Sequence, residues 1–290
     1  VEGAADEKTE KAAETETDSD VVEEEAEETT AEETAAKTAE PEQVETVITD
    51  NSYTDGNISI LITEYRINDT NVYVADITLS SPDYLSTAFA KGTYGKNVTA
   101  KTSVTAESVN AILAINGDYY GVQESGYVLK NGVLYRSTAK KNQEDLVIYE
   151  DGSFEIINES KVTAEELLEK GAVNILCFGP GLIIDREISV DVNDEVDKAK
   201  SSNPRTAIGL IDDLHYVFVV ADGRTSESEG LSLYELAEFM EELGVTCAYN
   251  LDGGGSSTMV FNGELVNTPT TTGKKSGTER SVSDIVYIGY

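Results

Sequence analysis

Histidine, cysteine and tryptophan are scarce in this chain of 290 residues, which has one His, two Cys and no Trp. A Ser-His-Asp triad would have to use His215, which lies in the apolar run LHYVFVV, where a histidine is expected to be structural. The same counts exclude a histidine-rich zinc site and argue against a zinc cluster, because Cys177 and Cys247 are far apart in the sequence. The remaining catalytic groups are carboxylates, arginines, hydroxyls and amides, which suit glycosyl chemistry.

Basic side chains are also few: 21 Lys and Arg face 55 Asp and Glu, which gives a net charge of −34 and a pI near 4.1. This balance excludes nucleic acid as a partner, since duplex binding needs Lys and Arg to displace counterions. It also disfavours an anionic membrane surface. A phosphate-bearing substrate would therefore have to be held by a few placed cations.

No apolar run reaches the length of a membrane span, and the sequence shows neither an initiator Met nor a signal peptide. We therefore expect contact with a membrane only through an N-terminal anchor that has been removed. Cys177 and Cys247 both lie in apolar, strand-like runs, which favours two buried thiols. A disulfide would need their Cα atoms within about 7 Å, and the sequence leaves that open, as it does the oligomeric state.

The first 45 residues are low in complexity and strongly acidic. Residues 1–50 carry 19 acidic and 3 basic side chains, a net of −16, so the rest carries −18 and is itself acidic. A segment with so few large apolar side chains cannot offset its ordering entropy, which predicts a disordered acidic linker over 1–45 before a domain over 46–290. We interpret the linker as a stalk of a bacterial protein that is extracellular or anchored at the cell surface; a solvated tail without a partner is the alternative.

The remainder predicts an α+β domain with mixed, largely antiparallel sheets and a few flanking helices. Asn131-Gly132, Asp151-Gly152 and Asn262-Gly263 are typical of tight hairpin turns. Helices are predicted after the capping boxes at 163–166 and 232–235, and a third over 105–110. The predicted strands are 57–63, 71–79, 111–116, 127–134, 146–149, 153–157, 173–184, 205–211, 214–221, 246–251, 257–261 and 284–289.

Four stretches resemble neither core nor linker: NGDYYG at 116–121, NPRTA at 203–207, ADGR at 221–224 and NLDGGGSST at 250–258. Each adjoins an apolar strand, and loops at strand ends often carry ligand sites because a rigid sheet holds them. Asp-Gly alone is a common turn, so each stretch by itself is a weak signal. The three consecutive glycines at 253–255 are stronger, because backbone N–H groups can approach a ligand closely there. No Lys follows these glycines, so the loop is not a nucleotide P-loop.

Taken in order, with the helix SLYELAEFMEELG between the last two and TERSVSD at 278–284, these stretches resemble the phosphodiester glycosidase family. The resemblance covers about residues 90–290, and LDGGGSS with its preceding helix is the most specific part. It implies hydrolysis of a sugar-1-phosphodiester at the anomeric C–O bond, in a cell-surface or extracellular polysaccharide. The leaving group is then a stable phosphate anion, so cations that hold it should matter more than a strong general acid.

On this resemblance we predict roles for the polar residues of the motifs. Arg205 and Arg280, then Arg224, are predicted to clamp the phosphate, since the guanidinium fork pairs with its oxygens. Asp252 and Asp222, then Asp118, are predicted as acid, base or nucleophile. A surface ion pair for each Arg and a turn cap for each Asp are the alternatives. The predicted substrate-binding residues are Asn116, Thr206, Gly253, Gly254, Ser256 and Ser257, with Tyr119 or Tyr120 as a stacking face for sugar.

Two other functions remain open: a non-catalytic carbohydrate-binding or exopolysaccharide-assembly protein on the same fold, and a phosphodiesterase that cuts P–O instead of C–O. An enzyme should bring Arg and Asp side chains into one cleft, whereas a binding module more often shows an exposed aromatic stripe. No cofactor is expected. The carboxylates would allow a divalent cation, but no ligand spacing indicates one.

Overall fold

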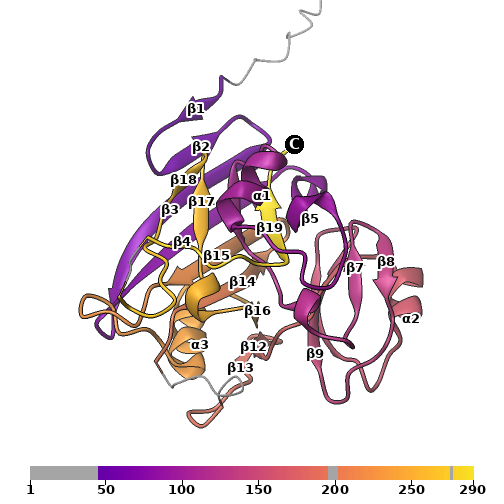
Figure 1. The fold of residues 1–290 in the computed structure, drawn as a ribbon. Coiled ribbons are helices and arrows are strands. Elements are labelled where there is room, and N and C mark those ends of the chain that lie inside the picture. Colours follow the sequence, from indigo (N-terminus) through magenta and orange to yellow (C-terminus); the bar gives the residue numbers. More distant parts are fainter. Residues whose placement is uncertain (1–44, 195–201, 275–276) are drawn as a thin grey trace, which may run out of the picture. The chain divides into compact units, whose positions relative to one another are not determined.

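The computed structural model describes residues 45–194, 202–274 and 277–290 (Figure 1). Residues 1–44, almost all of the predicted acidic linker, lie outside the described residues, so the linker and its boundary stay predictions. The described chain is mostly antiparallel strands with a few short helices. The predicted α+β class with largely antiparallel sheets is confirmed.

A nine-stranded antiparallel sheet is the largest element, with the strand order β1-β2-β3-β4-β15-β14-β16-β12-β13. It brings the first strands of the domain beside strands from the second half of the chain, because β4 pairs with β15. Its strands are β1 Val47–Ile48, β2 Ser52–Thr54, β3 Ile58–Ile67, β4 Thr70–Leu79, β15 His215–Ala221, β14 Arg205–Asp212, β16 Cys247–Asn250, β12 Gly181–Ile184 and β13 Glu187–Ile188.

Three smaller sheets complete the strands. A five-stranded sheet has the order β18-β17-β6-β19-β5, a three-stranded sheet has the order β10-β9-β11, and β7 pairs with β8. In Figure 1, β7, β8 and β9 lie together with α2 at one side of the ribbon. The bounds are β5 Leu85–Phe89, β6 Leu113–Asn116, β7 Val128–Lys130, β8 Val133–Arg136, β9 Glu144–Tyr149, β10 Phe154–Asn158, β11 Ala172–Leu176, β17 Met259–Phe261, β18 Glu264–Leu265 and β19 Asp284–Ile288.

Each α-helix begins close to where the sequence indicates. The predicted capping boxes are present before α2 (Ala164–Glu169) and α3 (Leu233–Glu242), where Thr163 and Ser232 accept the amide of the third helical residue. The third helix, α1, spans Thr102–Ser108 and so begins three residues before the predicted 105–110. Short 3₁₀ turns occur at Pro82–Tyr84, Ala90–Gly92, Tyr120–Val122 and Gly254–Ser256.

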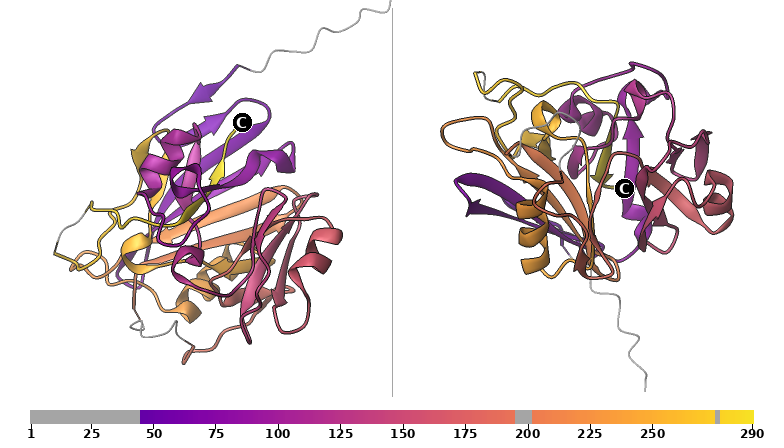
Figure 2. Two further views of the ribbon diagram at one scale, coloured as in Figure 1. Left: turned by 45° about the vertical axis from the view of Figure 1, so that its right-hand side comes forward. Right: turned by 90° about the horizontal axis from the view of Figure 1, so that it is seen from below.

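The two faces of the nine-stranded sheet are covered differently. Along β15, Tyr216, Phe218 and Val220 point into a core shared with strands of the five-stranded sheet. The residues between them, such as Val217 and Val219, pack on the other face against α3. This period of two is the alternation expected of a strand that is buried on both faces. Figure 2 shows α3 on one side of the sheet and the smaller strands on the other.

The predicted turns and strands are confirmed with few exceptions. Asn131-Gly132 and Asn262-Gly263 have positive φ at both residues and join β7 to β8 and β17 to β18. Two predicted strands are wrong as single elements. Phe178 to Pro180 interrupt 173–184 between β11 and β12, and the Asn131-Gly132 turn divides 127–134 into β7 and β8. The sequence analysis also missed β5 and the short strands β1, β2, β13 and β18.

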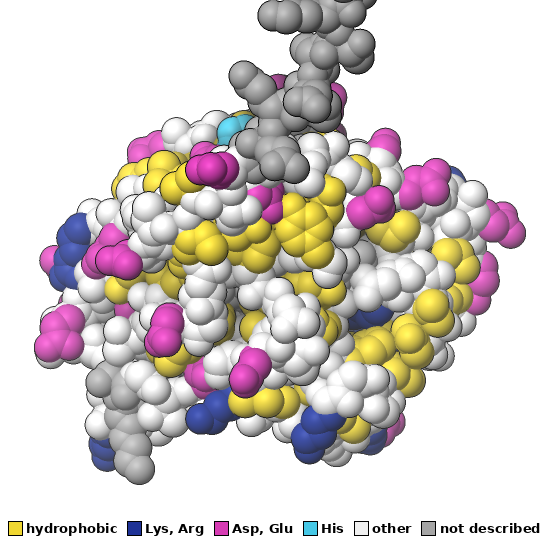
Figure 3. Space-filling model, turned by 90° about the horizontal axis from the view of Figure 1, so that it is seen from above, with side chains coloured by type: hydrophobic (Ala, Val, Ile, Leu, Met, Phe, Trp, Pro, Cys, Tyr) yellow, Lys and Arg dark blue, Asp and Glu magenta, His cyan; other side chains and the backbone are white. Residues whose placement is uncertain are grey.

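The surface of the molecule is acidic, as the composition predicts. Acidic side chains are spread over the face of the molecule shown in Figure 3, between patches of apolar side chains.

None of the helices in the described ranges is long and apolar enough to cross a membrane. Cys177 is buried and Cys247 is half-buried, and both are free thiols.

Candidate active site

The register of the large sheet brings three of the four motifs to one edge. β14 begins at Arg205, which lies opposite Ala221 at the end of β15. On its other side β14 pairs Ala207 with Asn250, the last residue of β16. Because antiparallel neighbours place the start of one strand beside the end of the next, NPRTA, ADGR and NLDGGGSST meet there.

A cavity of about 720 Å³ opens at this edge, within the usual size range of small-molecule sites. Its described lining contains four cationic side chains and a single carboxylate, Asp252, although the chain as a whole is strongly acidic. Tyr119 and Phe178 supply the aromatic part of the wall. The lining residues are Tyr119, Gln123, Lys140, Phe178, Asn203, Pro204, Arg205, Arg224, Asn250, Leu251, Asp252, Gly253, Gly254 and Arg280.

Asn116, predicted to bind sugar, instead connects the loops behind the cavity. It is fully buried at the end of β6 and does not line the cavity. Its Nδ2 donates to the carbonyl of Asp252 (2.6 Å), and its Oδ1 accepts from the Thr206 hydroxyl (2.8 Å) and the Thr258 amide (3.2 Å). The Asn116 side chain thus joins its own motif to NPRTA and NLDGGGSST. Thr206, also predicted to bind substrate, is buried in the same network through its hydrogen bond to Asn116.

Asp252 is held at the cavity by Arg280 and Ser256. Arg280 Nη2 lies 3.1 and 3.0 Å from the two carboxylate oxygens, and the Ser256 hydroxyl donates to Oδ2 at 2.6 Å. Burial raises the pKa of Asp252, while the Arg280 charge and the Ser256 hydrogen bond oppose that rise. The carboxylate is therefore held in a fixed orientation at the cavity.

The guanidinium groups of Arg224 and Arg280 lie close enough to repel each other. Burial lowers the pKa of Arg224, and the Arg280 charge lowers it further. Arg224 donates to Asn203 Oδ1 (3.3 and 3.1 Å) and to the Thr271 carbonyl (2.6 Å), so among described residues it has neutral partners only. Arg205, almost fully buried, donates to the Leu231 carbonyl at 2.8 Å and also lines the cavity. Such a group of cations favours an anionic ligand.

The glycine loop passes close to these side chains. Gly254 has φ +61, and a Cβ added there would lie 2.9 Å from Arg224 Nη2. Gly253 accepts from Arg280 Nη2 through its carbonyl (3.1 Å), and a Cβ on it would meet the Pro204 carbonyl at 2.9 Å. The absence of a Cβ at these two positions leaves room for the Arg224 side chain and the Pro204 carbonyl. The predicted close approach of backbone N–H groups to a ligand stays a prediction.

Two predicted carboxylates lie outside the cavity lining. Asp118 is buried in an ion-pair network in which Lys130 contacts both Asp118 (3.1 Å) and Asp284 (2.7 Å). Burial and the Asp118 charge raise the pKa of Asp284 to about 7. Asp222 is buried and accepts from Asn267 Nδ2 (2.9 Å) and the Thr268 amide (3.1 Å). Burial raises its pKa, against these hydrogen bonds.

The remaining predicted residues divide between the cavity and its support. Ser256 and Ser257 are buried behind the loop and do not line the cavity, whereas Gly253 and Gly254 do. Tyr119 is 38% exposed and lies edge-to-face with Phe178 at 6.3 Å, whereas Tyr120 is buried. The sequence analysis missed Lys140 and Phe178. Lys140 precedes a second Lys in a polar run, and Phe178 lies in a stretch assigned to a strand, so neither had a local signal.

Residues 109–289, more than half of the chain, match the phosphodiester glycosidase family. The chain belongs to the phosphodiester glycosidase family. The match includes all of the cavity-lining motifs and confirms the resemblance inferred from them. At the level of the family, the chain is a relative of hydrolases that act on glycosyl phosphodiesters.

Individual relatives agree with this membership. This glycosidase domain is 31% identical over 178 residues to an uncharacterised prophage-derived protein of Bacillus subtilis, a match covering 60% of this chain and 26% of that protein. It is 29% identical over 183 residues to mouse N-acetylglucosamine-1-phosphodiester alpha-N-acetylglucosaminidase, covering 57% and 34%. The human enzyme of that name matches 65 residues at 49% identity, covering 22% and 12%. The chain therefore spans about a third or less of these curated relatives.

Solved structures share the fold. The catalytic domain of the zebrafish N-acetylglucosamine-1-phosphodiester alpha-N-acetylglucosaminidase, auto-inhibited by its pro-peptide, superposes with a TM-score of 0.65 at 24% identity. That match covers 81% of this chain and 83% of the zebrafish domain. A hypothetical protein from Synechocystis gives a TM-score of 0.56 at 15% identity, covering 80% of this chain and 62% of that one.

Proposed function

We propose that this phosphodiester glycosidase hydrolyses the anomeric C–O bond of a sugar-1-phosphodiester in a bacterial cell-surface or extracellular polysaccharide. The observation that carries the proposal is the charge of the cavity: Lys140, Arg205, Arg224 and Arg280 line it, and Asp252 is the carboxylate in its described lining. In a chain with a net charge of −34, so many cations at one cavity favour a ligand that is itself anionic.

A phosphate monoester leaves as an anion, which suits this set of side chains. Ordinary glycosidases use two carboxylates, one of them to protonate the departing oxygen. Here the cations would stabilise the charge that develops on the phosphate, in place of that proton. Asp252, the carboxylate in the described lining, would then act at the anomeric carbon as nucleophile or as base for water. Both roles need Asp252 ionised, which the Arg280 charge favours.

Tyr119 gives the cavity a surface suited to a sugar ring. Tyr119 is exposed and lies next to Phe178, and both residues line the cavity. A non-catalytic carbohydrate-binding protein would use such a ring without needing a carboxylate held by an Arg and a Ser. The contacts of Asp252 with Arg280 and Ser256 therefore favour catalysis over binding alone.

The test is hydrolysis of an N-acetylglucosamine-1-phosphodiester in heavy-oxygen water, with the products read by mass spectrometry. We expect the label on the released sugar, because water attacks C1 when the C–O bond breaks. Label in the phosphate would instead identify a phosphodiesterase, and binding without turnover across a panel of glycosyl phosphodiesters would favour the non-catalytic alternative. Samples without protein give the spontaneous rate.

The pH dependence of an Arg280→Gln variant tests the state of Asp252. Removing the cation removes an interaction that lowers the Asp252 pKa, so that pKa should rise. Because the ionised form is the active one, activity should be lost at a higher pH than in the wild type as pH falls, by about 1–3 pH units. The pH profile of kcat/KM measures this; an acid limb that stays in place would contradict the assignment of Asp252.

A further inference from the structure

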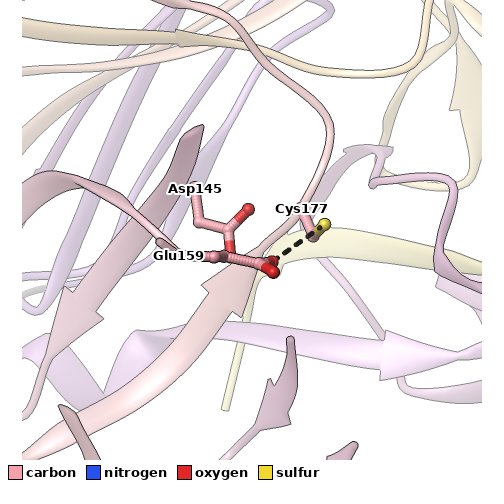
Figure 4. A group of neighbouring side chains, drawn as sticks. All are labelled: Asp145, Glu159 and Cys177. Atoms are coloured by element: carbon pink, nitrogen blue, oxygen red, sulfur yellow. Dashed lines mark hydrogen bonds between the residues drawn. The ribbon is translucent and has the colours of Figure 1, made fainter. Parts of the chain in front are cut away.

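A second cluster of polar side chains lies away from the cavity, in the three-stranded sheet. Asp145 is on β9, Glu159 follows β10 and Cys177 follows β11, and all three are buried. One carboxylate oxygen of each acid and the Cys177 sulfur lie within 4.8 Å of one another. Figure 4 shows the two carboxyl groups facing each other, with the sulfur facing Glu159.

Asp145 is completely buried, and neither of its carboxylate oxygens has a hydrogen-bond partner outside the group that it forms with Glu159 and Cys177. A carboxylate buried in this way is costly, because it has lost its water and faces a second acid instead of a cation. Asp145 points into the space that it shares with Glu159 and Cys177. A ligand in that space would give these oxygens their missing partner.

Glu159 is held in place because each of its carboxylate oxygens accepts a hydrogen bond from a backbone amide. Oε1 accepts from the Tyr127 amide at 2.8 Å and lies 3.6 Å from Cys177 Sγ, and Oε2 accepts from the Lys140 amide. Gly126 leaves room for the sulfur, because a Cβ there would lie 2.5 Å from Sγ. Ligand atoms that are already held in place lower the free-energy cost of ordering the site when an ion binds.

We propose that Asp145, Glu159 and Cys177 bind a divalent cation, and that the cation is Zn²⁺. Mg²⁺ and Ca²⁺ take oxygen ligands, whereas zinc accepts thiolate and carboxylate together. With Zn–S and Zn–O bonds of about 2.3 and 2.0 Å, tetrahedral geometry places S and O about 3.5 Å apart. The separation of 3.6 Å between Sγ and Glu159 Oε1 agrees with that. Water would take the fourth position.

The ion would support the cavity, because it would join segments that carry cavity-lining residues. None of the three residues lines the cavity, but their neighbours do: Phe178 follows Cys177, and the Lys140 amide donates to Glu159. By joining β9 to the segments after β10 and β11, the ion would hold Lys140 and Phe178 in position. The three ligands are separated by 14 and 18 residues, a spacing unlike that of the usual zinc motifs.

Metal content and thermal unfolding of the full chain test this proposal without an activity assay. We expect the protein, freed of metal by a chelator and then given Zn²⁺, to bind about one ion per chain by plasma mass spectrometry. Its Tm should rise by about 5–10 °C when free zinc is a hundredfold above Kd. Co²⁺ in place of Zn²⁺ should show thiolate-to-metal charge-transfer absorption.

Variants separate this site from adventitious binding. Cys177→Ser should lose the charge-transfer band, and Asp145→Asn, which keeps the shape of the side chain, should weaken zinc binding by at least about tenfold. Cys247→Ser removes the other free thiol and should change neither. A wild-type protein that binds no zinc, with an unchanged Tm and no cobalt band, would overturn the proposal and leave Asp145 and Glu159 as a pair sharing a proton. A cobalt band lost only in Cys247→Ser would overturn it as well.

Discussion

Replacing Asp252 by Asn is expected to lower kcat on a sugar-1-phosphodiester by about 10²–10⁴-fold, the range that a positioned acid–base group contributes. Asn keeps the size of the side chain but cannot take a proton or attack carbon. KM should change little, because the cations that hold the phosphate remain. Initial rates over a range of substrate concentrations give kcat and KM separately.

The control for Asp252→Asn is Asp213→Asn, an exposed carboxylate in the turn between β14 and β15, which should leave kcat unchanged. Urea unfolding of both variants checks that the fold is retained. An Asp252→Asn enzyme within tenfold of the wild-type kcat would remove Asp252 from the chemistry. A large loss of kcat in a folded Asp222→Asn variant would assign that role to the carboxylate that lies outside the cavity lining.

Replacing Arg224 by Gln is expected to raise KM by about 10–100-fold. A hydrogen bond to a charged group contributes about 1.5–3 kcal/mol, and about 1.4 kcal/mol is a factor of ten. Arg224 is the natural choice because its partners, Asn203 and the Thr271 carbonyl, are neutral, so its charge is available to a phosphate. Arg224→Lys should restore affinity only in part, since an ammonium lacks the planar fork.

Arg186→Gln is a matched control for Arg224→Gln. Arg186 is also exposed and also has a left-handed backbone, with φ 71 against 63 for Arg224, but it is not in the cavity lining. Any effect of placing Gln at such a backbone position should therefore appear in both variants. Equal KM values in the two would show that Arg224 does not contact the substrate.

Most of the local structure was predictable, because its causes lie within a few residues of each other. Ser232 and Glu235 cap α3 across one turn, and Asn131-Gly132 forms its hairpin through its own dihedral angles. The interruption of the strand predicted over 173–184 has a signal in the sequence, because Gly179-Pro180 is typical of a turn, and apolar content alone overlooks it. That Phe178 lines the cavity has no such signal. Periodicity cannot distinguish a core side chain from a cavity wall.

The sequence by itself determined the antiparallel α+β character, the family and the motifs that border the cavity. Only the tertiary structure decided which residues of those motifs reach it: Arg224 and Asp252 do, whereas Asp222 and Asn116 are used behind it. It alone brought Asp145, Glu159 and Cys177 together. Alternation, capping and turn dihedrals act between near neighbours in the chain, but the direction of a loop side chain depends on strand register and on contacts with distant segments.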